Sequence, residues 1–251
     1  MEISGNEKVY VRIEDLGRMS YREAWDYQEL LLQANLAIKT ERRKREMHTL
    51  SDSDTNLADL KTSNHLLFVE HPPVYTLGKS GDMNHVLISE SERQKRDIEF
   101  AETNRGGDIT FHGLGQIVGY PILDLEYFGT DIGKYLRRLE EVIIRVLSDY
   151  GLSGARSVGE TGVWLDPDIK GRERKICAMG VRCSRWITMH GFALNVNTDL
   201  SFFQHIIPCG IPDKKVTSLQ QELGRALELD EVKEKIQLHF AEVFGVRFID
   251  I

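Results

Sequence analysis

The sequence predicts one α+β domain. Strand-like and helix-like segments follow one another without the regular strand–helix–strand rhythm of a doubly wound sheet. The chain has 251 residues, 41% of them hydrophobic and 28% charged, which is ordinary for a globular protein with a substantial core. No repeat, low-complexity tract or linker rich in Pro, Gly or Ser divides it. We therefore expect a single domain over residues 1–251.

Four helices are expected, and three- and four-residue spacing of apolar side chains is clearest in the third. They lie at 21–47, 89–96, 131–150 and 232–244. Gly151 follows the third helix, where a C-terminal cap is typical. The fourth is expected to close the fold. The basic run at 42–45 suits the C-terminal end of the first helix, with docking of an acidic partner as the alternative.

Strands are expected where short apolar runs are bounded by turn-forming residues. These runs are 9–13, 65–70, 98–103, 117–125, 162–165, 176–181 and 188–196. The polar, turn-prone segment 51–62 is predicted to be a surface loop.

Charge and cysteine content exclude several classes of protein. The formal net charge of −7 argues against a general nucleic-acid binder. No apolar run approaches the roughly 18 residues of a membrane span, and residues 1–13 resemble neither a secretory signal nor a transit peptide. Three cysteines are too few for a disulfide framework. We expect a cytoplasmic protein with free thiols and with no nucleic-acid or membrane partner.

A glycine-rich stretch, RGGDITFHGLGQ at 105–116, is a candidate ligand loop. Its glycines let the backbone approach a ligand closely, and Arg105, Thr110, His112 and Gln116 add hydrogen-bond donors. The stretch lacks the Walker lysine and does not follow the dinucleotide-binding pattern. On composition, a ligand loop and a tight hairpin with a structural histidine remain equally open.

Cys209 is a candidate nucleophile. Two prolines and a glycine in IPCGIP, at 207–212, hold its backbone rigidly, and reaction requires such fixing. Cys177 and Cys183 lie within strand-like apolar patterns, where a buried structural cysteine is the commoner role. These two cysteines and His190 lack the close ligand pairs of structural zinc sites, so we expect no metal.

Lys175 is a candidate partner for a reactive thiol. A nearby cation lowers the pKa of a cysteine, and a partly desolvated lysine can act as its base. Spacing alone does not place Lys175 beside Cys209. Residues 170–185 carry six basic side chains and one acid, a local charge of +5. Either a solvated surface or a landing patch for an acidic carrier domain fits this charge.

Four motifs in order resemble the lipoyl(octanoyl) transferase family. They are EHPPVYTLGK at 70–79, RGGDITFHGLGQIVGY at 105–120, RKICAMGVRCSRWITMHGFALNV at 174–196, and PCGI at 208–211 followed by VTSL at 216–219. The resemblance implies the fold of the biotin/lipoate protein ligase superfamily, with a mixed sheet flanked by helices around one acyl pocket. Segment 41–62 looks like a surface insertion beyond the family core.

The resemblance also implies a reaction. An octanoyl group would move from octanoyl-acyl carrier protein to a lysine on the lipoyl domain of a 2-oxoacid dehydrogenase or on the glycine-cleavage H protein. This is the first step of endogenous protein lipoylation, in lipoate biosynthesis. Cys209 would carry the acyl group as a thioester, and Lys175 would activate it. The implied substrate-binding residues are Arg105, Gly106, Gly107, Asp108, Ile109, Thr110, Phe111, His112, Ala178, Met179, Gly180, Gly191, Phe192 and Ala193.

A thioester donor is already activated, so we expect no ATP and no other cofactor, and we expect a monomer. Leu114, Cys177 and Phe192 depart from the family's usual residues, and Phe192 could reshape the acyl slot.

One alternative function is that of an ATP-dependent lipoate or biotin ligase on the same fold, which would need an adenylate site. Another is a non-catalytic carrier-binding protein. A papain-like hydrolase would need its own cysteine and histidine signature, which is not found.

Overall fold

The computed structural model describes residues 8–48, 59–208 and 215–249. A mixed β-sheet lies at its centre, with strand order β12-β1-β2-β6-β10-β9-β8-β7 and with β11 paired to β9. The strand bounds are β1 Val9–Arg18, β2 His65–Glu70, β6 Gln116–Ile122, β7 Gly154–Ala155, β8 Val163–Leu165, β9 Arg174–Ser184, β10 Ile187–Asn195, β11 Lys215–Val216 and β12 Val246–Ile249. β1 pairs in parallel with both β12 and β2, whereas β2, β6, β10, β9 and β8 pair antiparallel. The predicted α+β class and mixed sheet are confirmed.

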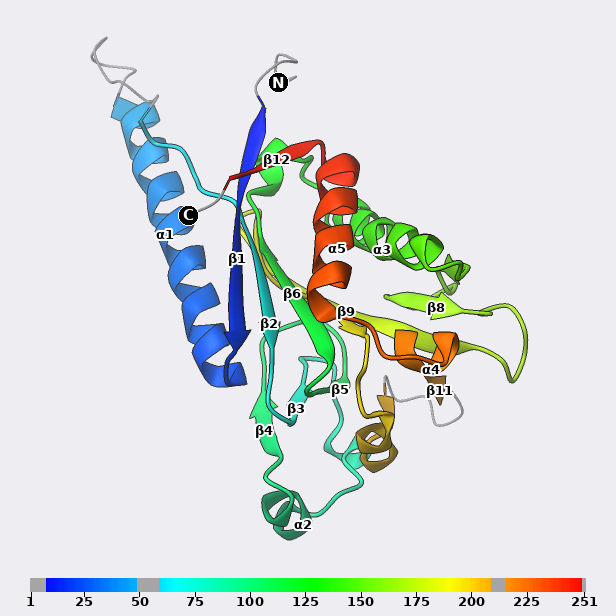
Figure 1. The fold of residues 1–251 in the computed structure, drawn as a ribbon. Coiled ribbons are helices and arrows are strands. Elements are labelled where there is room, and N and C mark those ends of the chain that lie inside the picture. Colours follow the sequence, from blue (N-terminus) through cyan, green and yellow to red (C-terminus); the bar gives the residue numbers. More distant parts are fainter. Residues whose placement is uncertain (1–7, 49–58, 209–214, 250–251) are drawn as a thin grey trace.

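Helices cover both faces of this sheet, α1 on one side and α3 with α5 on the other (Figure 1). The helices are α1 Tyr21–His48, α2 Glu90–Lys95, α3 Ile132–Asp149, α4 Leu219–Leu223 and α5 Leu229–Phe244, with short 3-10 helices η1 Met83–His85, η2 Leu125–Tyr127 and η3 Leu200–His205. None of the helices in the described ranges is long and apolar enough to cross a membrane.

A smaller sheet supports the glycine-rich loop. Its order is β4-β3-β5, with bounds β4 Glu99–Glu102, β3 Val74–Leu77 and β5 Ile109–His112. Apolar side chains of this sheet, including Tyr75 and Phe111, pack against Phe203 of η3. Because the segment 105–108 connects β4 to β5, this sheet fixes both ends of the loop.

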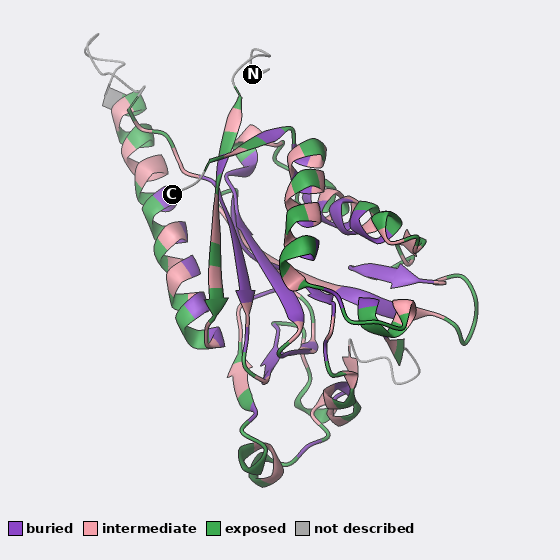
Figure 2. Ribbon diagram, viewed as in Figure 1, coloured by how far each residue is buried: buried purple, intermediate pink, exposed green. Residues whose placement is uncertain are grey.

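Each face of the central sheet has its own apolar core. On the α1 face, Leu32 packs in a cluster with Leu67 and Val118. On the other face, Leu139 of α3 and Phe240 of α5 belong to a larger cluster that also contains strand residues. Each such side chain stabilises the folded state by about 1.5–3 kcal/mol when it is fully buried rather than exposed. Figure 2 shows the buried strands between helices whose outer surfaces are exposed.

All four predicted helices are present, although α5 begins earlier than expected, at Leu229, and the short helix α4 was not predicted. Asp131 caps the N-terminus of α3 by accepting a hydrogen bond from the Lys134 backbone N–H, and Gly151 follows the helix with φ of 74°. The basic run at 42–45 lies in the last turns of α1. Arg42 pairs there with Glu46 one turn away, as expected for a solvated helix face.

Several strand predictions were incomplete, and one prediction was wrong. α5 does not close the fold, because β12 follows it and pairs with β1. The segments 9–13 and 176–181 are only parts of the longer strands β1 and β9. The expected insertion at 41–62 begins with the end of α1, and its residues 49–58 lie outside the described residues.

Candidate active site

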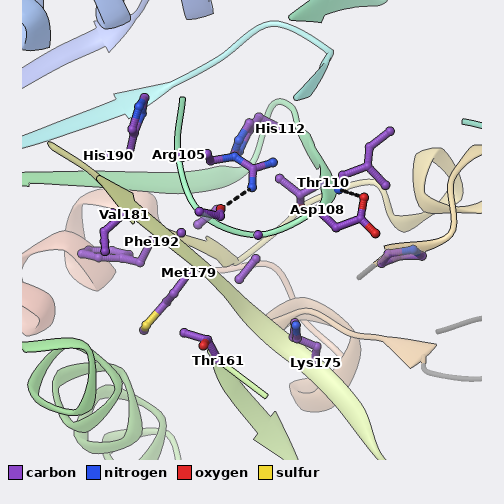
Figure 3. A pocket seen from close by; sticks show the side chains of 18 of the residues that line it. Arg105, Asp108, Thr110, His112, Thr161, Lys175, Met179, Val181, His190 and Phe192 are labelled. Atoms are coloured by element: carbon purple, nitrogen blue, oxygen red, sulfur yellow. Dashed lines mark hydrogen bonds between the residues drawn. The ribbon is translucent and has the colours of Figure 1, made fainter. Parts of the chain in front are cut away.

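A cavity of about 660 Å³ opens beside β9. Its walls come from loop 105–110, from β9 and β10, from the segment 159–161 before β8, and from Tyr21 in the first turn of α1. The cavity contains Lys175 and every predicted substrate-binding residue except Phe111. In Figure 3, Arg105 and Asp108 lie on one side of the β9 ribbon, and Met179 and Thr161 lie on the other.

Phe111 is the exception because it points away from the cavity. It is 1% exposed and stacks on Phe202 at 4.6 Å between ring centroids. We had expected it to contact the substrate. Alternation along β5 sends it into the core beneath the small sheet instead.

Glycines bring the 105–108 loop against its neighbours. The Gly106 N–H donates to the Val181 carbonyl at 3.0 Å, so the loop joins the edge of β9. A Cβ on Gly180 would lie 2.7 Å from the Gly106 oxygen, and one on Gly78 would lie 2.2 Å from the Gly107 oxygen. No larger residue fits at either position without moving backbone.

Arg105 holds this loop from inside. Its guanidinium donates to the Thr76 carbonyl at 2.5 Å, to the Thr76 hydroxyl at 2.9 Å and to the Gly106 carbonyl at 3.1 Å. The residue is 8% exposed. Arg105 therefore shapes the cavity wall as well as giving it positive charge.

The inner end of the cavity is lined by uncharged aromatic groups. Burial lowers the pKa of His112 well below its usual value, and burial with the Arg105 charge lowers that of His190 to about 3. Burial raises the pKa of Tyr21 to about 12. His112 bonds Gln116 through Nδ1 at 2.8 Å. At neutral pH these rings carry no charge.

Among His65, His71 and His112, one lines the cavity and two have structural partners elsewhere. His112 lines the cavity, but His65 and His71 do not. His65 bonds Glu14 at 2.9 Å, and His71 lies between the Met19 carbonyl and the Tyr120 hydroxyl.

Lys175 occupies a buried position on the cavity wall. Its side chain is 9% exposed, and Nζ lies 4.0 Å from a Glu160 carboxylate oxygen. The ammonium also lies 4.6 Å from the Trp164 ring centroid. Both neighbours attract a positive charge, and they restrict where Nζ can lie.

Cys209 lies outside the described residues, but the chain on both sides of its segment reaches the site. Pro208 lines the cavity. On the far side, Val216 of β11 pairs with Lys175 and also lines the cavity. The structure therefore anchors both flanks of segment 209–214 at the cavity that holds Lys175.

The other two cysteines fit the structural role predicted for them. Cys177 is fully buried, and burial raises its pKa far above the usual range. Cys183 packs against the same core, and burial raises its pKa as well. A raised pKa reduces the thiolate fraction, so neither is suited to nucleophilic attack at neutral pH.

The basic cluster at 170–185 is not one patch. β9 spans about 30 Å between its two ends, which separates Lys170 and Arg172 from Arg182 and Arg185. Much of the charge is also paired. Arg174 bonds Asp166 and Glu222, and Arg182 bonds Glu29 at 2.8 Å; these three acids lie outside the segment. The interpretation of residues 170–185 as a single landing surface of charge +5 is therefore wrong.

Comparison with known proteins identifies the family. The profile of the lipoyl protein ligase A/B catalytic domain matches residues 20–241. An octanoyltransferase from Christiangramia forsetii is 55% identical over 93% of this chain and 95% of its own length. One from Flavobacterium johnsoniae is 54% identical over 95% of this chain and 98% of its own. The chain belongs to the octanoyltransferase family. As predicted, it is an acyltransferase.

Solved structures show that this octanoyltransferase family member has the fold of lipoate ligases. A bipartite lipoate protein ligase from Thermoplasma acidophilum superposes with a TM-score of 0.67 at 17% identity, covering 97% of this chain and 87% of that one. Lipoate-protein ligase A bound with ATP gives 0.64 at 15% identity, covering 98% and 90%. At these identities the likeness concerns the fold alone.

Proposed function

We propose that this protein transfers an octanoyl group from octanoyl-acyl carrier protein to a lysine of a lipoyl domain, with Cys209 carrying the acyl group as a thioester. The observation that carries the proposal is the cavity, which is lined by Lys175 and by Pro208 and Val216 on the two flanks of the Cys209 segment. The octanoyltransferase name of relatives above 50% identity supports the acyl group. We further propose a single cytoplasmic domain that acts as a monomer without a cofactor.

The reaction has two balanced steps. Lys175 takes the Cys209 proton, the thiolate attacks the octanoyl carbonyl, and the carrier's thiolate leaves and takes the proton from Lys175. A neutral acceptor amine then attacks the Cys209 thioester and forms an amide. The sulfur leaves and is protonated again. Both bonds that break are carbon–sulfur bonds, so no nucleotide is needed for activation.

The floor of the cavity suits a hydrocarbon chain. Ala178, Gly180, Gly191 and Ala193 are small residues on neighbouring strands, and all line it. An extended octanoyl chain has seven carbon–carbon bonds of about 1.5 Å and spans roughly 9 Å. Three residues of strand span about 10 Å, the distance from Lys175 to Ala178 along β9. Each buried CH₂ contributes about 0.8 kcal/mol to binding.

The rim near Lys175 offers a smaller basic surface to an acidic carrier. Lys170 and Lys215 lie close to each other there, because the Lys215 ammonium donates to the Gly171 carbonyl at 3.4 Å. Arg172 lies in the same turn, where it bonds Asp166 at 3.2 Å. We propose this end of β9 as the donor docking side, in place of the whole 170–185 segment.

The first test is the covalent intermediate. Incubation with octanoyl-acyl carrier protein should add one octanoyl group to the protein, measured by intact mass spectrometry. Cys209→Ser should abolish the hydroxylamine-labile adduct, and Cys183→Ser should retain it as the matched control. Absence of an adduct on the parent protein, or its persistence in Cys209→Ser, would refute the thioester scheme.

The fold also fits an ATP-dependent ligase, since a ligase of this fold binds ATP. That alternative predicts attachment of free octanoate to a lipoyl domain only when ATP is present. Transfer from octanoyl-acyl carrier protein with ATP omitted would exclude it.

A further inference from the structure

The second step of the proposed reaction releases one proton more than the Cys209 sulfur takes up. The acceptor lysine arrives as an ammonium with three N–H bonds, and the amide product keeps one. One released proton returns to the Cys209 sulfur, whether directly or through Lys175. The other must leave the site, and a proton acceptor close to water provides a route for it.

His85 and Asp108 form a hydrogen-bonded pair on the cavity wall. Nδ1 of His85 lies 2.6 Å from a carboxylate oxygen of Asp108, and both residues line the cavity. The other Asp108 oxygen accepts the backbone N–H groups of Ile109 at 2.7 Å and Asp82 at 3.3 Å. Three hydrogen bonds therefore hold the Asp108 carboxylate in place.

This arrangement fixes the tautomer of the neutral histidine ring. An ionised carboxylate only accepts hydrogen bonds, so Nδ1 carries a proton, and in the neutral ring the lone pair lies on Nε2. Within the described part of the chain, Nε2 makes no hydrogen bond. The His85 side chain is 24% exposed, so a proton taken at Nε2 can pass to solvent.

The backbone ties His85 to the chain that leads to Cys209. The Ile207 N–H donates to the His85 carbonyl at 2.9 Å, and Leu87 donates to the His205 carbonyl at 2.9 Å. Val86 and Ile206 form an isolated β-bridge between the two segments. Residue 207 is two positions before Cys209 in the sequence. The same contacts therefore hold both His85 and the approach to the proposed nucleophile.

We propose that His85, oriented by Asp108, is a further catalytic residue that accepts the proton of the acceptor lysine's ammonium. The inference rests on the proposed function. In the acceptor half-reaction, His85 Nε2 removes one proton, and the neutral amine attacks the Cys209 thioester. The tetrahedral intermediate then loses its second N–H proton as the sulfur leaves, and that proton reaches the sulfur. His85 releases its proton to water.

The test separates the two half-reactions. The octanoyl-protein is prepared with octanoyl-acyl carrier protein, freed of carrier, and mixed with an unmodified lipoyl domain in a quenched time course. In His85→Gln, transfer should slow about 100-fold while loading changes less than about twofold. In Asp108→Asn, transfer should slow by a smaller factor, but by more than loading does. His205→Gln, on the paired segment but outside the cavity lining, is the matched control and should transfer normally.

Cleavage of the acyl-protein by hydroxylamine distinguishes a role of His85 in proton transfer from a role in supporting the loop. Hydroxylamine is largely unprotonated near neutral pH and needs no base, so it should cleave the acyl-protein equally fast in every variant. Normal transfer in both His85→Gln and Asp108→Asn would overturn the inference. The inference would also be overturned if these two variants slowed loading, transfer and hydroxylamine cleavage by the same factor. The His85–Asp108 pair would then only support the loop. If the parent protein forms no acyl adduct, the proposed function itself fails.

Discussion

At the scale of single residues, Lys175 shows how a cavity can restrict the position of one charged side chain. Glu160, Trp164 and the cavity wall leave its ammonium little freedom. A cation held in this way stabilises a thiolate that comes near it. The proposed role of Lys175 therefore has two separable parts, a charge and a transferable proton.

Lys175→Ala should slow alkylation of Cys209 by iodoacetamide about 10-fold near neutral pH, because loss of the cation raises the thiol pKa. Lys175→Arg should keep most of the alkylation rate but lose acyl transfer, since a guanidinium keeps its proton. Peptide mass spectrometry over time measures the first rate. Equal alkylation of Cys209 in the parent and Lys175→Ala would contradict thiol activation by this lysine.

The residues that sequence could indicate were those inside recognisable motifs. Loop 105–112 and Lys175 were predicted in this way, and all but Phe111 line one cavity. His85 and Glu160 were missed because they lie in a three-residue 3-10 helix and in a connecting segment, neither of which carries a periodic pattern. The position of His85 also depends on a pairing between distant segments, that of Val86 with Ile206, which local spacing does not reveal.

At the scale of elements, the contact between β6 and β10 depends on two glycines. Gly119 lies opposite Phe192, and a Cβ there would sit 2.1 Å from the phenylalanine ring. Gly191 packs against the Gly119 carbonyl, where a Cβ would also lie 2.1 Å away. The ring of Phe192 therefore fills the space that Gly119 leaves open, and this packing accommodates the departure from the family's usual residue.

Gly119→Ala should lower the free energy of unfolding by about 1–3 kcal/mol through overpacking against Phe192. Phe192→Leu in the same background should recover part of that loss, because the two positions are in contact. Urea unfolding measures both. Gly133→Ala in α3, whose new methyl meets only the Asp131 carboxylate at 3.2 Å, is the matched control. Additive effects at 119 and 192 would contradict the packing argument.

Helices were easier to predict than strands for a physical reason. The apolar spacing of α3 repeats over 18 residues, whereas β12 and β3 are each only four residues long. A four-residue strand carries little periodic signal, and its partner decides whether it forms. β1 continues beyond its apolar start into Glu14 and Asp15, which pair with β2 all the same.

At the scale of the whole molecule, buried histidines link stability to pH. Burial lowers the pKa of His71 to about 4 and that of His190 to about 3. In the unfolded chain both titrate near 6.5. Between these values the unfolded state binds more protons, so stability is complete above about pH 6.5 and falls as the pH falls toward 4.

Each of these histidines should contribute a loss of about 1.4 kcal/mol per pH unit over that range. Urea unfolding at about pH 7.5 and about pH 5 measures the combined slope. His71→Gln should flatten the slope even if it lowers stability at both pH values. An unchanged slope in His71→Gln would contradict this account of acid sensitivity.

The pairing of β1 with β12 also has a consequence for how the protein is made. Val9 lies beside Val246, so β1 is completed by a strand that is synthesised much later than β1 itself. Until residues 246–249 leave the ribosome, the outer edge of β1 presents backbone groups with no β12 to bond. Such long-range pairing slows folding, because a large loop must close before the contact forms. The nascent chain therefore passes through a stage at which this open edge is exposed to association with other chains.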